Sequence, residues 1–135
     1  LGATVDTFVV NGTIWVECGD LETGTKHFES ALRLQPNDSD WFLTKRLVPM
    51  YYRQGSIEKT INLIEPHLNA IDLSSELLVF YSLAKLEAGE MDQAKAYFEK
   101  AKLIGVTAKS LRNLLREDES TKEFIAKLKP LGSID

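Results

Sequence analysis

The sequence predicts an all-α fold, an α-solenoid of about three helix-turn-helix repeats that ends in a C-terminal helical cap. Gly19, Gly55 and Gly89 are separated by 36 and 34 residues, and each begins a similar segment. Nine residues after each glycine stands a large apolar residue, at Phe28, Ile64 and Phe98. A period near 34 residues whose unit holds two helical patterns is typical of an α-solenoid.

The length and composition predict one domain over residues 1–135. The chain has 135 residues, of which 44% are hydrophobic and 27% are charged, so it is long enough to form a continuous core. The formal charge of −4 argues against nucleic acid as a main ligand, because phosphate binding needs a basic face. We therefore expect a protein or peptide partner and no nucleic acid.

Two further features of the sequence bear on localisation. The longest apolar-rich stretch, Thr7 to Val16, is interrupted by polar residues and falls short of the roughly 18 residues that a membrane span requires. Cys18 is the only cysteine, which excludes an internal disulfide and is compatible with a reducing compartment. The expected location is cytoplasmic, with no membrane contact.

The first repeat is expected at about residues 5–38. Its first helix covers Val5 to Val16, although the β-branched residues of this stretch leave a strand as the rival interpretation. Its second helix shows an apolar or small face with spacings of three and four residues, at Leu21, Gly24, Phe28, Ala31 and Leu32. Pro36 should end that helix, because proline cannot donate a backbone hydrogen bond.

The second and third repeats are expected at about residues 39–74 and 75–106. Residues 37–40 are rich in oxygen acceptors for free amide groups, so a helix should begin near Asp40 or Trp41. Pro49 lies inside that helix, where it should leave the carbonyl of Lys45 without a donor and produce a kink. A widened central groove would follow, or else the proline is tolerated divergence. In all repeats the glycine should end the first helix through a positive φ.

Residues 107–130 are predicted to form the C-terminal cap. One helix is expected over Ala108 to Arg116, and Ser120 and Glu123 have the spacing of a capping box before a second helix. A terminal element of a solenoid must show a polar side to water. The residues that can supply that side are Lys109, Arg112, Arg116, Lys122 and Lys127.

The chain resembles the tetratricopeptide repeat (TPR) family over about residues 5–106. The first repeat matches the family pattern at Phe8, Gly12, Trp15, Gly19, Gly24, Phe28, Ala31 and Pro36. The third matches at Leu78, Ser82, Gly89, Ala94, Phe98 and Ala101. The second keeps Tyr51, Gly55 and Ile64 but has Val48, His67 and Asp72 where the family has small residues and proline. The resemblance implies a right-handed solenoid that acts as a protein-interaction scaffold, and implies no chemistry. Because the first helix has no cap on its outer side, we expect the chain to be one region of a larger protein.

No pattern of catalytic or metal-binding residues is present in the sequence. His27 and His67 fall in different repeats and lack metal-ligand spacing, and the acidic run at 117–119 lacks the alternating ligands and glycine of a calcium loop. No phosphate-cradling loop or nucleophile elbow occurs. We therefore expect no enzyme activity, no catalytic residue, no metal and no cofactor.

The first helices of successive repeats line the inner surface of a solenoid, where partner segments bind. At inward positions, Lys45, Arg46 and Arg53 are expected to contact a carboxylate or acidic segment of the partner. The apolar side chains of the partner are expected to be held by Phe42, Tyr52, Phe80 and Leu83. Arginine and aromatic residues carry much of the binding energy at interfaces. The alternative is that the basic residues are merely solvated and the apolar ones pack inside the solenoid.

Two further expectations concern the partner. The TPR clamp for a C-terminal carboxylate uses lysine and asparagine at positions that hold Val9 and Thr13 here, so a chaperone-tail clamp is not expected. The competing hypothesis to groove binding is self-association, including a homodimer, in a sensory or oligomerising region of a multidomain bacterial regulator or nucleotide cyclase. In that hypothesis the uncovered N-terminal face and the exposed aromatic residues bury against a second copy.

Overall fold

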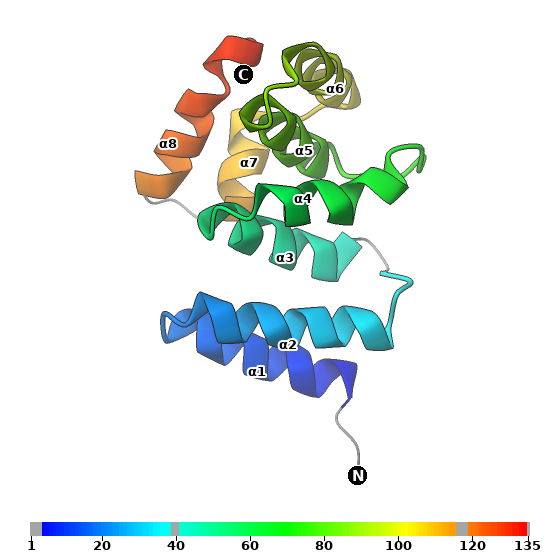
Figure 1. Cartoon of the computed structure of the whole chain (residues 1–135), viewed down its shortest axis with the longest axis vertical. Helices are drawn as coiled ribbons and strands as arrows, with labels where there is room; N and C mark the ends of the chain where they lie inside the picture. Colours follow the sequence, from blue (N-terminus) through cyan, green and yellow to red (C-terminus); the bar gives the residue numbers. More distant parts are fainter. Residues whose placement is uncertain (1–3, 39–40, 116–118, 135) are drawn as a thin grey trace. The chain divides into compact units, whose positions relative to one another are not determined.

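The computed structural model describes residues 4–38, 41–115 and 119–134, and the side chains of residues 119–121 lie outside this description. Every regular element in these ranges is helical, which confirms the all-α prediction (Figure 1). The chain divides into two compact units, Leu1–Gly55 and Ser56–Asp135. The division falls between the two helices of the expected repeat 39–74, and the single-domain organisation stays a prediction.

The first unit contains three helices, α1 (Val5–Glu17), α2 (Leu21–Leu34) and α3 (Phe42–Arg53). The stretch that could have been a strand is therefore helical. The helix α1 begins where Thr4 Oγ1 accepts a hydrogen bond from the Thr7 amide at 3.2 Å. In this unit α2 packs against both α1 and α3 (Figure 1).

Two glycines bring α1 and α2 into close contact. A Cβ atom at Gly12 would lie 2.9 Å from Phe28 Cε2, and one at Gly24 would lie 2.6 Å from Val16 Cγ2. Real Cβ atoms do not approach other atoms so closely, so neither position has room for a side chain. The packing of the helices therefore requires glycine at both sites.

The predicted glycine turns are confirmed. Gly19, Gly55 and Gly89 have φ angles of 90°, 70° and 85°. After α1, the amide of Asp20 donates to the carbonyl of Trp15 at 2.9 Å, which pairs a carbonyl that the helix leaves without a donor. Because L-residues rarely adopt such φ angles, the repeated glycine sets the same reversal after each first helix.

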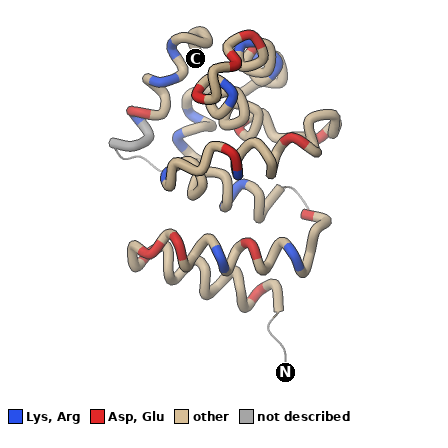
Figure 2. The backbone as a smooth tube through the Cα atoms, in the orientation of Figure 1, with Lys and Arg blue, Asp and Glu red and all other residues tan. Residues whose placement is uncertain are grey.

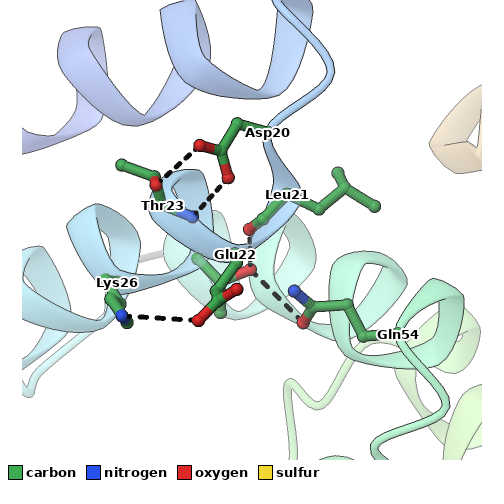
Figure 3. Close-up of polar contacts among 7 residues, drawn as sticks. Asp20, Leu21, Glu22, Thr23, Lys26 and Gln54 are labelled. Atoms are coloured by element: carbon green, nitrogen blue, oxygen red, sulfur yellow. Dashed lines mark hydrogen bonds and ion pairs between the residues drawn. The ribbon is translucent and has the colours of Figure 1, made fainter.

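The start of α2 is fixed by Asp20 (Figure 3). Its Oδ1 accepts from the Thr23 amide at 3.0 Å and its Oδ2 from the Thr23 hydroxyl at 2.8 Å. Both hydrogen bonds favour the carboxylate and so lower the pKa of Asp20. The bond from the Thr23 amide has the larger effect. The helix ends at Leu34, two residues before Pro36, as the sequence predicts.

The start of α3 is fixed by Asp38, one of the acceptors expected between residues 37 and 40. Its carboxylate accepts from the amides of Leu43 at 2.9 Å and Thr44 at 2.8 Å, and from the Thr44 hydroxyl at 2.8 Å. Asp40 lies outside the described residues. The helix then continues through Pro49 to Arg53, so the proline does not end it.

The second unit begins with α4 (Ile57–Ile64), which continues into the short 3₁₀ helix η2 (Glu65–His67) at Pro66. The antiparallel pair α5 (Ser75–Glu87) and α6 (Met91–Ile104) follows. Residues 77–84 of α5 are all buried, so this helix is enclosed on every side. A helix that is apolar all round belongs in a core.

The C-terminal segment forms α7 (Ala108–Leu115), α8 (Glu119–Lys127) and the 3₁₀ helix η3 (Lys129–Leu131). The two predicted helices are thus present, although the capping-box side chain Ser120 lies outside the description. The ring centroids of Phe80 in α5 and Phe124 in α8 are 4.6 Å apart. Lys109, Arg112, Lys122 and Lys127 are exposed, and Arg116 is not described. The C-terminal segment therefore buries apolar residues and shows lysine and arginine to water.

Candidate functional site

The candidate site in the first unit is the face of α3 that its core leaves uncovered. Seven of the twelve residues of this helix are buried. The other five are exposed or half-buried, and all five are residues that the sequence assigned to partner contact, namely Phe42, Lys45, Arg46, Tyr52 and Arg53. We call this set the α3 face.

The burial of the rest of α3 fixes the orientation of the α3 face. Met50 and Tyr51 are each 5% exposed, and Tyr51 contacts α2 through its hydroxyl. Successive residues of a helix are about 100° apart, so a helix held on one side presents a defined opposite side. The α3 face is therefore held by rigid secondary structure.

The α3 face combines cations with exposed aromatic surface. The guanidinium carbon of Arg46 lies 4.8 Å from the ring centroid of Phe42, a cation–π contact, and the Phe42 side chain is 46% exposed. Lys45 precedes Arg46 directly, and Arg53 ends the helix. No aspartate or glutamate occurs in α3, so its tube carries blue but no red among the tan (Figure 2). This helix can attract a carboxylate while offering a flat apolar ring beside it.

The other two predicted contact residues, Phe80 and Leu83, are placed differently. Each is 1% exposed, and the Phe80 ring packs against Phe124 in the core of the second unit. Their assignment to partner contact is thus corrected, since neither side chain is accessible in this structure. The physical reason is that α5 has no uncovered side.

A polar contact between a tyrosine and a glutamate occurs in both units and was not predicted from the sequence. Glu29 and Glu65 both stand ten residues after a turn glycine. The Tyr51 hydroxyl donates to Glu29 Oε2 at 2.6 Å within the first unit. The Tyr81 hydroxyl donates to Glu65 Oε2 at 3.0 Å within the second unit. The signal for this contact was the equal spacing from the glycines, which apolar periodicity alone does not reveal.

These contacts change the acidity of the two phenols. Burial, and then the hydrogen bond to Glu65, raises the pKa of Tyr81 to about 12. Burial and the Glu29 hydrogen bond raise the pKa of Tyr51 still further. In the second unit Lys85 Nζ also lies 3.8 Å from Glu65 and 2.8 Å from Glu90. The hydrogen bond to Glu90 is the main cause that raises the pKa of Lys85. All of these groups have structural partners.

Other kinds of site were sought in the part of the chain that the structure describes. No cluster of three or more histidine, cysteine, aspartate or glutamate residues with the geometry to hold a metal ion occurs there. None of the described helices has the length and apolar character needed to cross a membrane.

Comparison with known proteins adds no family to this picture. No family model matches the chain, and neither a curated protein nor a solved structure matches it.

Proposed function

We propose that this protein is a protein-interaction module that binds an acidic segment of a partner on the α3 face. The observation that carries the proposal is the composition of that face, which has three cations, two aromatic residues and no acid on one rigid helix. A carboxylate would approach Lys45 and Arg46, while an apolar side chain beside it would contact the Phe42 ring. Charge of one sign on one surface steers an oppositely charged partner and sets its orientation.

A TPR-like solenoid is the architecture that we propose for the chain. Three features support it: the positive φ at the three repeated glycines, the close crossing at Gly12 and Gly24, and the glutamate that recurs ten residues after Gly19 and Gly55. The positive φ and the glutamate recur at equivalent positions, which is what a repeat sequence produces, and the close crossing fits the small residues of the first repeat.

The test of the binding function is a selection from a random linear peptide library. We expect enriched peptides to carry aspartate or glutamate next to an aromatic or large aliphatic residue. Reversal of charge in Lys45→Glu with Arg46→Glu should weaken the selected peptides by about tenfold or more, since attraction becomes repulsion. Binding should also weaken as salt rises, because exposed charges are screened.

The matched control is Lys95→Glu, an exposed lysine of α6 that makes no ion pair with a described residue. It changes the net charge in the same direction away from the α3 face and should leave peptide affinity unchanged. Circular dichroism checks that all variants remain helical. Enrichment of peptides without acidic residues, or equal losses in the control and the α3 variants, would contradict the proposal.

A further inference from the structure

We propose that the exposed side of α1 binds an amphipathic helix of a partner protein, and that this helix presents a carboxylate to Trp15 and basic residues toward Asp6 and Glu17. The exposed side is a stripe at helical spacing, formed by Thr7, Val10, Asn11, Ile14, Trp15 and Cys18. We call it the outer stripe. Val10, Ile14 and Trp15 are 57%, 52% and 43% exposed, so three large apolar side chains of one short helix face water.

The equivalent stripe of α3 shows what kind of element covers such a surface. Each residue of α1 corresponds to the α3 residue 36 positions later, because Gly19 and Gly55 are 36 apart. Ile14 thus corresponds to Met50 and Trp15 to Tyr51. Both α3 residues are buried, and Tyr51 bonds to α2. In α3 the Met50 and Tyr51 part of this stripe lies against α2, whereas Arg46, the equivalent of Val10, is exposed.

The stripe has the same role in α5. There the equivalent residues lie 70 positions after those of α1, so Trp15 corresponds to Lys85 and Ile14 to Ala84. Ala84 is buried and Lys85 faces Glu65 at the end of α4, against which α5 packs. In both helices the position equivalent to Trp15 therefore contacts the second helix of the preceding pair. In α1 the same stripe is open, and its complement is a helix.

The residue four positions before each turn glycine has a side chain that can donate a hydrogen bond. This residue indicates one polar group that the bound helix should carry. Tyr51 at this position donates to Glu29, and Lys85 lies 3.8 Å from Glu65, which accepts its hydrogen bond from Tyr81. Trp15 is the third residue at this position, and its indole nitrogen can only donate. None of the described residues accepts a hydrogen bond from it. A carboxylate on the bound helix, placed as Glu29 is placed on α2, would complete the pattern.

The charges of α1 favour a partner over a second copy of this chain. Asp6 and Glu17, both exposed, are the only charged residues of the helix. Symmetric pairing of two α1 helices, parallel or antiparallel, would bring acid toward acid. In head-to-tail pairing, the outer stripe of one copy would contact α6 of another copy. That helix has the charged residues Lys95 and Lys102 where α2 has Thr25 and Leu32. A partner helix with basic residues near its ends meets neither obstacle.

The helix α2 supplies a defined probe for the apolar and carboxylate contacts of this surface, while its ends carry Asp20 and Arg33 and not two basic residues. We would synthesise residues 20–35 as a peptide with a lactam bridge between Glu22 and Lys26. These two side chains form an i,i+4 ion pair at 3.6 Å and are 80% and 72% exposed, so the bridge stabilises the helix away from its packing faces. Cys18, the only cysteine and part of the outer stripe, takes an environment-sensitive fluorophore in the full chain.

The first measurement is a fluorescence titration of the labelled chain with this peptide. We expect saturable binding at concentrations up to about 1 mM. Ile14→Lys should weaken it by about tenfold, because a charge replaces an apolar contact. The matched control Leu103→Lys replaces an 88% exposed leucine of α6 and should have no effect. Failure to bind, or equal weakening by both variants, would overturn the proposal.

The second measurement is a double-mutant cycle between the protein and the peptide. Glu29→Ala in the peptide should weaken binding to the wild-type chain by about tenfold, the loss expected for a hydrogen bond to a charged group. Against Trp15→Phe, which keeps an aromatic ring and loses the donor, the same peptide change should have no effect. Equal losses against both chains would overturn the assigned contact.

Light scattering of the unlabelled chain over a range of concentrations tests the rival occupant. We expect no association that depends on the outer stripe. A dimer in the wild type that Ile14→Lys abolishes would assign this surface to a second copy and overturn the proposal.

Discussion

The Tyr51 hydroxyl in α3 donates a hydrogen bond of 2.6 Å to the Glu29 carboxylate in α2. Tyr51 is buried and Glu29 is half-buried, so the contact lies at the edge of the packed surface between two helices. A hydrogen bond to a charged group stabilises more than one between neutral groups. This contact therefore adds a directional bond to otherwise apolar packing.

Tyr51→Phe should lower the free energy of unfolding by about 1–2 kcal/mol, because Glu29 loses a charge-assisted donor while the ring is kept. Urea denaturation followed by circular dichroism measures the change. Tyr97→Phe is the matched control, since the Tyr97 ring packs edge-on against Tyr81 and its hydroxyl has no hydrogen-bond partner among the described residues. Equal losses in the two variants would show that the bond to Glu29 contributes nothing specific.

High pH should destabilise the fold through Tyr81. Its pKa is about 12 in the folded chain against an ordinary value of 10.0, so the unfolded chain loses this proton first. The stabilising contribution is complete below pH 10 and is lost as the pH rises toward 12. Tyr51 acts in the same direction.

Urea denaturation at about pH 9 and about pH 11.5 measures this loss. The decrease in stability between the two values should be smaller in Tyr81→Phe than in the wild type, because phenylalanine has no proton to lose. A wild type and a variant with the same decrease would refute the role of Tyr81.

Gly24→Ala should destabilise the first unit by about 1–3 kcal/mol, although alanine favours helix more than glycine does. The added Cβ would meet Val16 Cγ2 at 2.6 Å and the Gly12 carbonyl oxygen at 3.1 Å. Thermal and urea denaturation measure the loss. Adding Val16→Ala to Gly24→Ala removes the nearest clash and should recover part of the lost stability. If Gly24→Ala alone were as stable as the wild type, this result would contradict the close helix crossing.

Asp38→Ala should destabilise α3 by about 1–2 kcal/mol, because the amides of Leu43 and Thr44 lose their acceptor at the helix start. Hydrogen exchange of the amides in the first turn of α3 reports the loss locally, and urea denaturation reports it globally. The neighbouring exposed Asn37→Ala is the control and should change neither. Faster exchange in both variants alike would argue against a specific cap.

The helices of this chain could be predicted because their apolar residues recur every three or four positions. In α1 the β-branched residues favour extended chain, but the segment is helical and packs closely on α2, where Gly12 lies against Phe28. Packing between elements outweighs local propensity in that segment. The glycine turns were predictable for a simpler reason, since a positive φ is a property of the residue itself.

The candidate site could be predicted only in part. The α3 face was found because a helix packed on one side must expose the other. Phe80 and Leu83 were misplaced because α5 is covered on all sides, which a helical wheel cannot show. The only polar residue within its buried run of residues 77–84, apart from Tyr81, is Ser82, and such a run is itself a sign of an enclosed helix. Glu29 and Glu65 were missed because a glutamate on a helix normally faces water.

The recurring glutamate also bears on how the chain avoids misfolding. Apolar stripes of leucine, isoleucine and methionine are nearly interchangeable, so a helix displaced by one turn could still bury them. Such a slip moves a side chain by about 5.4 Å along the axis. The Tyr51 hydroxyl would then miss Glu29, and that carboxylate would lose its buried donor. The bond thus discriminates between the native alignment of the two helices and its nearest competitors, a selectivity that hydrophobic burial alone does not provide.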